Sequence, residues 1–189
     1  MTEYLDILNE QGEKVGTAPR SEAHAKGLLH RVAHCWVVSR RGDGVWVWFQ
    51  QRARDKADFP CYYDIAVGGH VGAGEKPLEA MVREIREEIG LTVPPKDLLY
   101  LGAFRDDILL PGFDDRELAE VFLYLHPAPD FRIGEEVERM IRLPQESLLR
   151  KSEEPVTAYT VSGEPVVIRP EEWCRHDGEI ERFLLPAFQ

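Results

Sequence analysis

The sequence predicts an α+β fold built on a mixed β-sheet. Two runs of β-branched and aromatic residues, 32–39 and 45–50, flank the glycine-containing segment Arg40–Gly44, so they are expected to pair as antiparallel strands. Residues 77–89 carry apolar side chains at steps of three and four, which is the pattern of an amphipathic helix. Strands and helices follow one another without a regular strand–helix–strand alternation, and this order is typical of the α+β class.

The other elements are predicted from turn signals and short apolar runs. Residues 4–8 and 14–16, separated by the turn signal Asn9–Gly12, indicate a small N-terminal hairpin. Pro77 suits the first turn of the central helix, and Gly90 is placed to end it. Two further strands, a short helix and a hairpin are expected at 98–104, 121–125, 144–150 and around 161–164.

One connection is expected to shape a pocket. The segment Arg105–Arg116 links two predicted strands and is rich in turn residues, so we interpret it as a lid or pocket loop. An inert excursion of the chain is the alternative.

Length and composition limit the class of protein. The chain has 189 residues, 43 % of them apolar and 30 % charged, which predicts one globular domain. With 23 Lys and Arg against 34 Asp and Glu, the net charge is −11, so nucleic acid is not an expected partner. Without a long apolar run or a signal-peptide pattern, and with three widely spaced cysteines, we expect no membrane contact, free thiols and a cytoplasmic location. The oligomeric state is left open.

The central helix carries three acids that we call the box acids: Glu84, Glu87 and Glu88. At ~100° per residue they fall within about 100° of one another beside the apolar stripe. Clustered carboxylates repel unless a cation relieves them, and hard oxygen ligands suit Mg²⁺ or Mn²⁺ better than zinc. Arg83 lies one turn before Glu87 and can hold that carboxylate. The alternative is a solvated acidic face, which is the commoner meaning of a charge run taken alone.

The spacing around these acids resembles the Nudix box. Residues 69–91 read as Gly, five residues, Glu, seven residues, Arg-Glu, an apolar residue, any residue, Glu-Glu, any residue, Gly and an apolar residue. The resemblance implies a Nudix-type α/β/α sandwich with a loop–helix–loop catalytic motif. It implies a single domain over 1–189, with a C-terminal extension at about 126–189 made of helices and a hairpin.

The resemblance also implies an activity, a metal and the roles of several residues. The activity is metal-dependent hydrolysis of a phosphoanhydride bond in a nucleoside di- or triphosphate, or in a nucleoside diphosphate linked to another moiety. Arg83 is implied as an orienting residue, and Glu75 as the loop glutamate of the motif. The implied ligands of Mg²⁺ or Mn²⁺ are Glu84, Glu87, Glu88 and the carbonyl of Gly68 or Gly69.

The general base is not fixed by the motif. A glutamate near the metal would take the proton of the attacking water, and we expect Glu87 or Glu120 to do so. Glu120 begins the predicted strand 121–125, and a rim carboxylate at a strand end is its alternative role.

Outside the motif, roughly residues 3–125 are similar to type I isopentenyl diphosphate isomerase, a relative with the same fold. The similar segments are Glu22–His24, Leu29–Arg31, Gln51–Lys56 and Phe59–Pro60. In that group the residues at the positions of Arg52 and Lys56 contact the substrate diphosphate, so the likeness implies them as phosphate ligands. Exposed charges at a strand end are the alternative. His70, inside the motif, is a candidate contact to substrate or metal, with a role in stabilising the turn as its alternative.

Departures from the isomerase favour hydrolysis. Gly68 stands where the isomerase carries its catalytic cysteine, and Leu118 where it has a second metal-binding glutamate. His24 and His30 resemble isomerase metal ligands, but the spacing differs and the rest of that set is missing, so we interpret them as surface or capping residues. His34, in an apolar run, is interpreted as a satisfied core histidine.

Two rival functions remain. One is an isomerase of isopentenyl diphosphate, against which Gly68 argues. The other is a non-catalytic ligand-binding module, against which the complete set of box acids argues.

Overall fold

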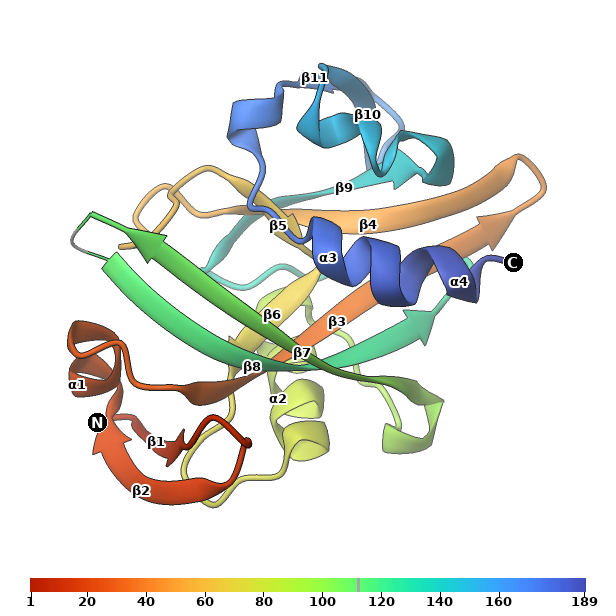
Figure 1. Ribbon diagram of the computed structural model, residues 1–189. Helices are drawn as coiled ribbons and strands as arrows, with labels where there is room; N and C mark the ends of the chain where they lie inside the picture. Colours follow the sequence, from red (N-terminus) through yellow and green to blue (C-terminus); the bar gives the residue numbers. More distant parts are fainter. Residues whose placement is uncertain (112) are drawn as a thin grey trace.

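The computed structural model describes residues 1–111 and 113–189 and contains one mixed sheet (Figure 1). Its strands are β1 (Tyr4–Leu8), β2 (Lys14–Pro19), β3 (His30–Arg41), β4 (Gly44–Arg52), β5 (Tyr63–Ile65), β6 (Val67–His70), β7 (Leu98–Leu110), β8 (Phe113–Leu125), β9 (Val137–Pro144), β10 (Val156–Thr160) and β11 (Pro165–Ile168). The longer helices are α1 (Arg20–Ala25), α2 (Pro77–Ile89) and a C-terminal helical run made of α3 (Asp177–Glu179), η5 (Ile180–Leu184) and α4 (Leu185–Ala187). Short 3-10 turns are η1 (Pro95–Asp97), η2 (Gln145–Ser147), η3 (Arg150–Ser152) and η4 (Pro170–Glu172).

Strand β3 is the centre of the sheet. The strands follow the order β11-β10-β9-β4-β3-β1-β2, with β5 added to β4 and β6 added to β3. Strand β8 pairs with β3 in parallel and with β7 in antiparallel orientation. The sheet is therefore mixed, as predicted.

Several predicted elements are confirmed. The N-terminal hairpin forms from β1 and β2, and β3 turns back into β4 with Arg41 opposite Gly44. Helix α2 begins at Pro77 and ends at Ile89, and Gly90 follows it in the left-handed conformation with φ of 69°. This conformation suits glycine, so the sequence ends the helix there.

The segment Arg105–Arg116, interpreted as a lid or pocket loop, does line the cavity with Asp106, Asp107 and Asp115, but it is mostly strand and not a loop. Strand β7 continues to Leu110 and β8 starts at Phe113, so the segment forms the end of a long hairpin. Residue 112 lies outside the described residues. The many charged side chains in this segment hid the strand because they line a polar cavity instead of an apolar core.

The region from 126 onward contributes more than an extension of helices and a hairpin. Strand β9 pairs with β4 along most of its length, inside the sheet. The predicted helix at 144–150 forms only the short turns η2 and η3, whereas the hairpin around 161–164 is confirmed as β10 and β11. The single-domain assignment stays a prediction.

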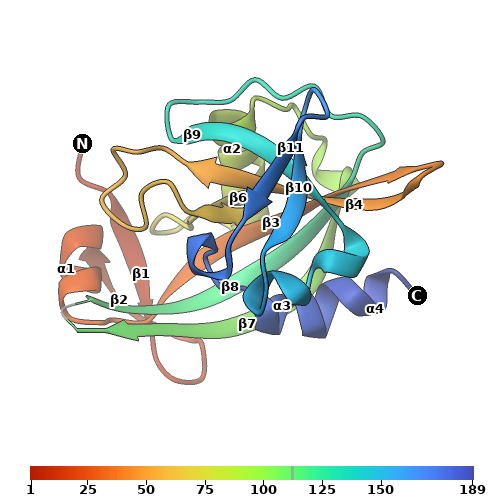
Figure 2. The same ribbon diagram turned by 90° about the horizontal axis from the view of Figure 1, so that it is seen from above.

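Two apolar layers cover the two faces of the sheet. On one face Met81, Ile85 and Ile89 of α2 pack against the sheet, and on the other Ile180 and Leu184 of the C-terminal run do so. Figure 2 shows α2 and the C-terminal helical run on opposite sides of the strands. The predicted sandwich of helix, sheet and helix is therefore confirmed. Among the described residues, no helix has the length and apolar character needed to cross a membrane.

Candidate active site

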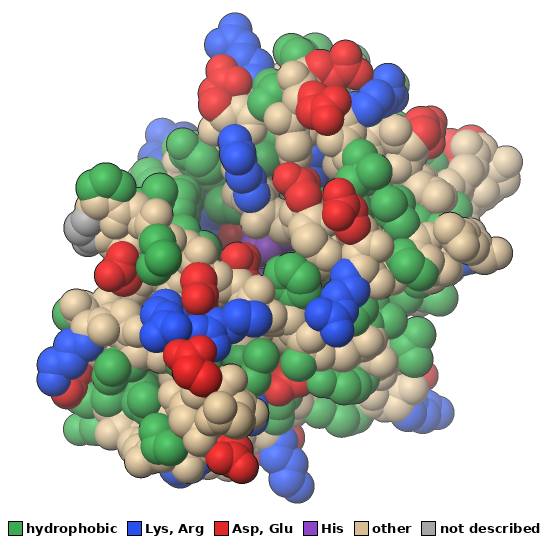
Figure 3. All heavy atoms as spheres, viewed as in Figure 1, with side chains coloured by type: hydrophobic (Ala, Val, Ile, Leu, Met, Phe, Trp, Pro, Cys, Tyr) green, Lys and Arg blue, Asp and Glu red, His purple; other side chains and the backbone are tan. Residues whose placement is uncertain are grey.

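A cavity of about 820 Å³ opens between α2, the turn end of the β7–β8 hairpin and the segment 170–176. Figure 3 shows a hollow on this face of the molecule with a histidine side chain at its bottom. The box acids line one end, together with Gly68, Gly69 and His70 of β6. The cavity thus collects most of the residues that the sequence singled out.

Glu88 is the most buried of the box acids. It is 7 % exposed and accepts hydrogen bonds from Gln50 Nε2 at 3.0 Å and from the Gly68 amide at 3.2 Å. Burial and the charge of Glu84 raise the pKa of Glu88 to about 8. Burial also raises the pKa of Glu84, and the charges of Glu87 and Glu136 add to this against the pull of Arg83. These carboxylates lie at a place where a cation would relieve them.

Arg83 holds the loop before α2 against the helix. Its guanidinium donates to Glu75 at 3.0 Å twice, to Glu84 Oε1 at 2.6 Å and to the His70 carbonyl at 3.2 Å. The distance to Glu87 Oε2 is 3.4 Å, so the predicted orienting contact exists but is the weakest of the set. Burial opposes ionisation of Glu75, but the hydrogen bonds from Arg83 and the Gly72 amide lower its pKa. Arg83 therefore holds Glu84 and Glu75 more closely than it holds Glu87.

Gly69 makes room for Glu84. A Cβ atom at this position would lie 2.2 Å from Glu84 Cδ and 2.4 Å from its Oε1, far inside contact distance. Only glycine allows the Glu84 carboxylate to lie over β6 at the cavity wall.

We expect Gly69→Ala to impair the site more than the fold. The new methyl group meets a side chain and no backbone, so Glu84 can move, which limits the loss of stability to about 1–3 kcal/mol. Displacing Glu84 should weaken Mn²⁺ binding at least about tenfold, measured by calorimetry. Gly42→Ala is the matched control, since nothing lies within 4 Å of a Cβ there. Equal Mn²⁺ affinity in both variants would contradict this role of Gly69.

The structure does not bring Glu120 to the box acids. Glu120 accepts hydrogen bonds from Arg31 Nε at 3.1 Å and from the Tyr100 hydroxyl at 2.6 Å. Side chains alternate along β8, so Asp115 and Glu117 line the cavity while Glu120 points to the other face. Of the two candidate bases, only Glu87 lies in the cavity lining, and its side chain is 55 % exposed.

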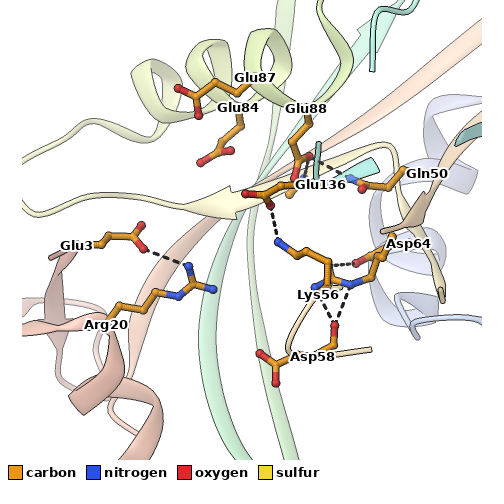
Figure 4. Close-up of polar contacts among 12 residues, drawn as sticks. Glu3, Arg20, Gln50, Lys56, Asp58, Asp64, Glu84, Glu87, Glu88 and Glu136 are labelled. Atoms are coloured by element: carbon orange, nitrogen blue, oxygen red, sulfur yellow. Dashed lines mark hydrogen bonds and ion pairs between the residues drawn. The ribbon is translucent and has the colours of Figure 1, made fainter. Parts of the chain in front are cut away.

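The basic residues of the cavity are differently engaged (Figure 4). Lys56 forms an ion pair with Glu136 beside the box acids. Arg52 donates to Asp64 Oδ2 at 3.1 Å and to the Asp58 carbonyl at 3.0 and 3.2 Å, so its guanidinium is committed to the protein. As a phosphate ligand, Arg52 is therefore less well placed than Lys56.

Two residues that line the cavity, Arg20 and Glu136, were not predicted from the sequence. Arg20, at the start of α1, pairs with Glu3 at 3.2 Å and lies across the cavity from the box acids. Glu136 comes from the segment before β9, whose Gly134 amide donates to the Glu88 carbonyl at 2.8 Å. Neither carries a local sequence signal, because each reaches the cavity only through distant packing.

His70 belongs to a cluster of three histidines. His24 Nε2 and His70 Nε2 lie 3.1 Å apart, and ring nitrogens of His24, His30 and His70 all lie within 4.8 Å of one another. Asp115 Oδ1 lies 3.5 Å from His30 Nε2, and both atoms are buried without a hydrogen-bond partner among the described residues. A carboxylate oxygen of Glu117 also lies within 4.8 Å of a ring nitrogen of His30 and of a carboxylate oxygen of Asp115.

His30 is fully buried, so its interpretation as a surface residue is wrong, whereas His24 lies partly exposed in the last turn of α1. Leu118 lacks the glutamate of the isomerase, as noted from the sequence, but Asp115 and Glu117 on the cavity side of β8 bring two carboxylates close to His30. Burial lowers the pKa of His30 and of His70, so each ring keeps a lone pair for a ligand. Imidazole and carboxylate donors together suit a transition metal ion.

One side of the cavity is bounded by the C-terminal region. His34 Nδ1 lies 2.7 Å from Glu179 Oε1, and Trp36 Nε1 donates to Glu179 Oε2 at 3.0 Å. His176 Nε2 lies 2.7 Å from Asp64 Oδ1. His34 is satisfied, as predicted, but it also lines the cavity.

We expect the His34–Glu179 pair to make stability decline at alkaline pH. Burial would lower the pKa of His34 from 6.5, but the Glu179 carboxylate outweighs this and raises it to about 9. The folded protein thus binds this proton more tightly than the unfolded chain. The stabilisation is complete below about pH 6.5 and is lost as the pH rises through about 9. Thermal unfolding of the wild type from pH 6 to 10 should show the decline, and Glu179→Gln should flatten it; parallel curves would contradict the assignment.

Fold and site together define a class of protein: a carboxylate-bearing helix, preceded by a glycine-rich loop, set against a mixed sheet at the edge of a large cavity. The NUDIX domain model matches residues 28–161, and the chain belongs to the Nudix family of hydrolases. Members of this family act on derivatives of nucleoside diphosphates and generally use divalent metal ions.

Named relatives agree with this assignment. The chain is 35 % identical over 126 residues to an uncharacterized Nudix hydrolase of Clostridium acetobutylicum, a match that covers 67 % of this chain and 61 % of that protein. It is 33 % identical over 126 residues to the isopentenyl-diphosphate Delta-isomerase of Escherichia coli O127:H6, covering 66 % of this chain and 67 % of the isomerase. The crystal structure of DR0079 from Deinococcus radiodurans matches with a TM-score of 0.63 and 26 % identity, covering 78 % and 87 % of the two chains.

Proposed function

We propose that this chain is a single-domain, metal-dependent hydrolase of phosphoanhydride bonds. Its substrates are nucleoside di- or triphosphates, or nucleoside diphosphates linked to another moiety. The observation that carries this proposal is the gathering of Glu84, Glu87 and Glu88 at one end of a large cavity, with Arg83 bonded to Glu84 at 2.6 Å. A binding module would not need repelling acids arranged in this way.

The donor set fits a divalent ion. Glu84, Glu87 and Glu88 offer only carboxylate oxygens, and the pKa of Glu88 is raised to about 8 in a place where a cation would favour its charged form. These three carboxylates, with the carbonyl of Gly68 or Gly69, would hold Mg²⁺ or Mn²⁺. When bound, such ions neutralise the diphosphate and lower the pKa of the attacking water.

The residues of the chain divide the remaining work. Glu87, exposed at the cavity edge, accepts the proton of the attacking water. Lys56 and Arg20, whose partners are the acids Glu136 and Glu3, can exchange these for phosphate oxygens of the substrate. Arg83 keeps Glu84 in position throughout.

The test is phosphate release from a panel of nucleotides, nucleotide sugars, dinucleoside polyphosphates, coenzyme A and isopentenyl diphosphate, each with Mg²⁺, Mn²⁺ or chelator. We expect release from the nucleotide-derived compounds that stops when chelator is added. Release that persists in excess chelator, or silence across the panel, would overturn the proposal.

A second candidate function is favoured by the histidine cluster. Two overlapping groups of possible metal ligands lie close to the box acids: His24, His30 and His70, and His30, Asp115 and Glu117. The hydrolysis proposed at the box acids does not require these residues. An isomerase of isopentenyl diphosphate would use such a second metal centre, but Gly68 leaves it without the cysteine at that position. Incorporation of deuterium from solvent into isopentenyl diphosphate would support the isomerase, and its absence would leave the hydrolase.

A further inference from the structure

Gln50 is a buried amide that the proposed hydrolysis does not use. It lies in β4 and is 3 % exposed. Its Nε2 donates to the Ala66 carbonyl at 3.2 Å and to Glu88 Oε2 at 3.0 Å (Figure 4). A backbone carbonyl can only accept, so the contact with Ala66 fixes the orientation of the amide with its nitrogen toward Glu88. Gln50 therefore presents a fixed donor to the most buried of the box acids.

The two carboxylate oxygens of Glu88 have different surroundings. Oε2 accepts two hydrogen bonds, one from Gln50 and one from the Gly68 amide at 3.2 Å. In the described part of the chain, Oε1 accepts none, and it is not sealed from the cavity that Glu88 lines. Oε1 is thus the oxygen that remains for a cation at the box acids.

Both donors belong to strands that are paired on both sides or backed by the centre of the sheet. Gln50 lies in β4 between β5 and β9, and Gly68 lies in β6 beside β3. Neither donor can follow the carboxylate if it rotates, so rotation of Glu88 would break two hydrogen bonds. The orientation of Glu88 is therefore set before any cation binds.

We propose that Gln50 is a positioning residue that limits Glu88 to one oxygen toward the cation, and that it thereby favours Mg²⁺ and Mn²⁺ over Ca²⁺. This inference rests on the proposed function for the cation at the box acids. Ca²⁺ takes six to eight oxygens and often both oxygens of a carboxylate, whereas Mg²⁺ is smaller and needs a compact octahedral set. With Oε2 engaged by its two donors, Glu88 cannot offer both oxygens to the larger ion.

The experiment is calorimetry of Mn²⁺ and of Ca²⁺ binding to the metal-free wild type and to Gln50→Met. Methionine has nearly the length of glutamine but no donor, so Glu88 loses one of the two hydrogen bonds that orient it. We expect Mn²⁺ to bind the variant about 10- to 100-fold more weakly, the usual effect of losing a partner of a metal ligand. Ca²⁺ affinity should fall much less, so the ratio of Mn²⁺ to Ca²⁺ affinity should drop at least about fivefold.

Gln51→Met is the matched control. Gln51 is the next residue of β4, and its Nε2 donates to the Cys61 carbonyl at 3.0 Å on the opposite face of the strand. Its substitution should leave both affinities unchanged. If thermal unfolding shows that Gln50→Met does not fold, Gln50→Asn replaces it, because that side chain keeps the amide but is one methylene too short to reach Glu88.

The change in the affinity ratio separates positioning from a structural role. Equal losses of affinity for the two ions, or unchanged Mn²⁺ affinity in a folded variant, would overturn the role of Gln50. A wild type that binds no Mn²⁺ would overturn it as well. The proposed function fails on a different result: if the wild type binds Mn²⁺ but cleaves no compound of the panel, hydrolysis is refuted, and the affinity ratios still decide the role of Gln50.

Discussion

Glu87→Gln is expected to lower kcat by about 10²- to 10⁴-fold, the usual contribution of a general base. The amide keeps the size of the side chain but can neither accept the proton of the attacking water nor bring a negative charge to the cation. The Glu87 side chain is 55 % exposed, and its ion pair is a 3.4 Å contact with Arg83. The substitution should therefore hardly change the stability of the fold. Steady-state kinetics on the best substrate of the panel and a thermal unfolding curve measure both effects.

Glu138→Gln is the matched control for this variant. Glu138 is also an exposed glutamate, and its partner is Arg54 at 3.3 Å, away from the box acids. Its activity should equal that of the wild type. Full activity in Glu87→Gln would remove Glu87 from the site, and because Glu120 faces away from the cavity, Glu136 would become the next residue to test.

The second large effect is on stability. Glu179→Ala should lower the free energy of unfolding by about 3–5 kcal/mol, because it leaves a buried His34 and the Trp36 indole N–H without their partner. Glu179 is only 1 % exposed, so water does not replace the lost contacts readily. For a chain of this size the Tm should fall by about 6–20 °C.

Glu181→Ala provides the comparison for that loss. Glu181 belongs to the same helical run but is exposed, so its removal should change the free energy of unfolding by less than about 0.5 kcal/mol. Equal melting curves for the two variants would show that Glu179 does not fasten the C-terminal run to the sheet.

The local part of the architecture could be predicted from the sequence. Helix α2 was predictable because its apolar stripe, its proline start and its glycine end all lie within fourteen positions. The box acids share one helix, so periodicity alone places them on one side of it. The β3–β4 hairpin was predictable for the same reason, since a short glycine turn joins two strongly apolar strands.

The rest of the site depends on contacts between distant positions. His34 and Glu179 are 145 positions apart, and Arg31 and Glu120 are 89 apart, so no local pattern reveals either pair. The face of a strand was also decisive. Asp115 and Glu117 reach the histidine cluster, whereas Leu118 and Glu120 do not, and this follows from where β8 begins and which strand it joins.

The most direct test of the account is phosphorus NMR of the wild-type protein with nucleotide-derived diphosphates, recorded with Mg²⁺ and then with excess chelator. We predict that phosphoanhydride signals of at least one compound are replaced by phosphate monoester or orthophosphate signals while Mg²⁺ is present, and that the conversion stops on chelation. Unchanged anhydride signals with Mg²⁺ and with Mn²⁺, from protein whose melting curve shows that it is folded, would contradict the claim that the box acids form a hydrolytic site.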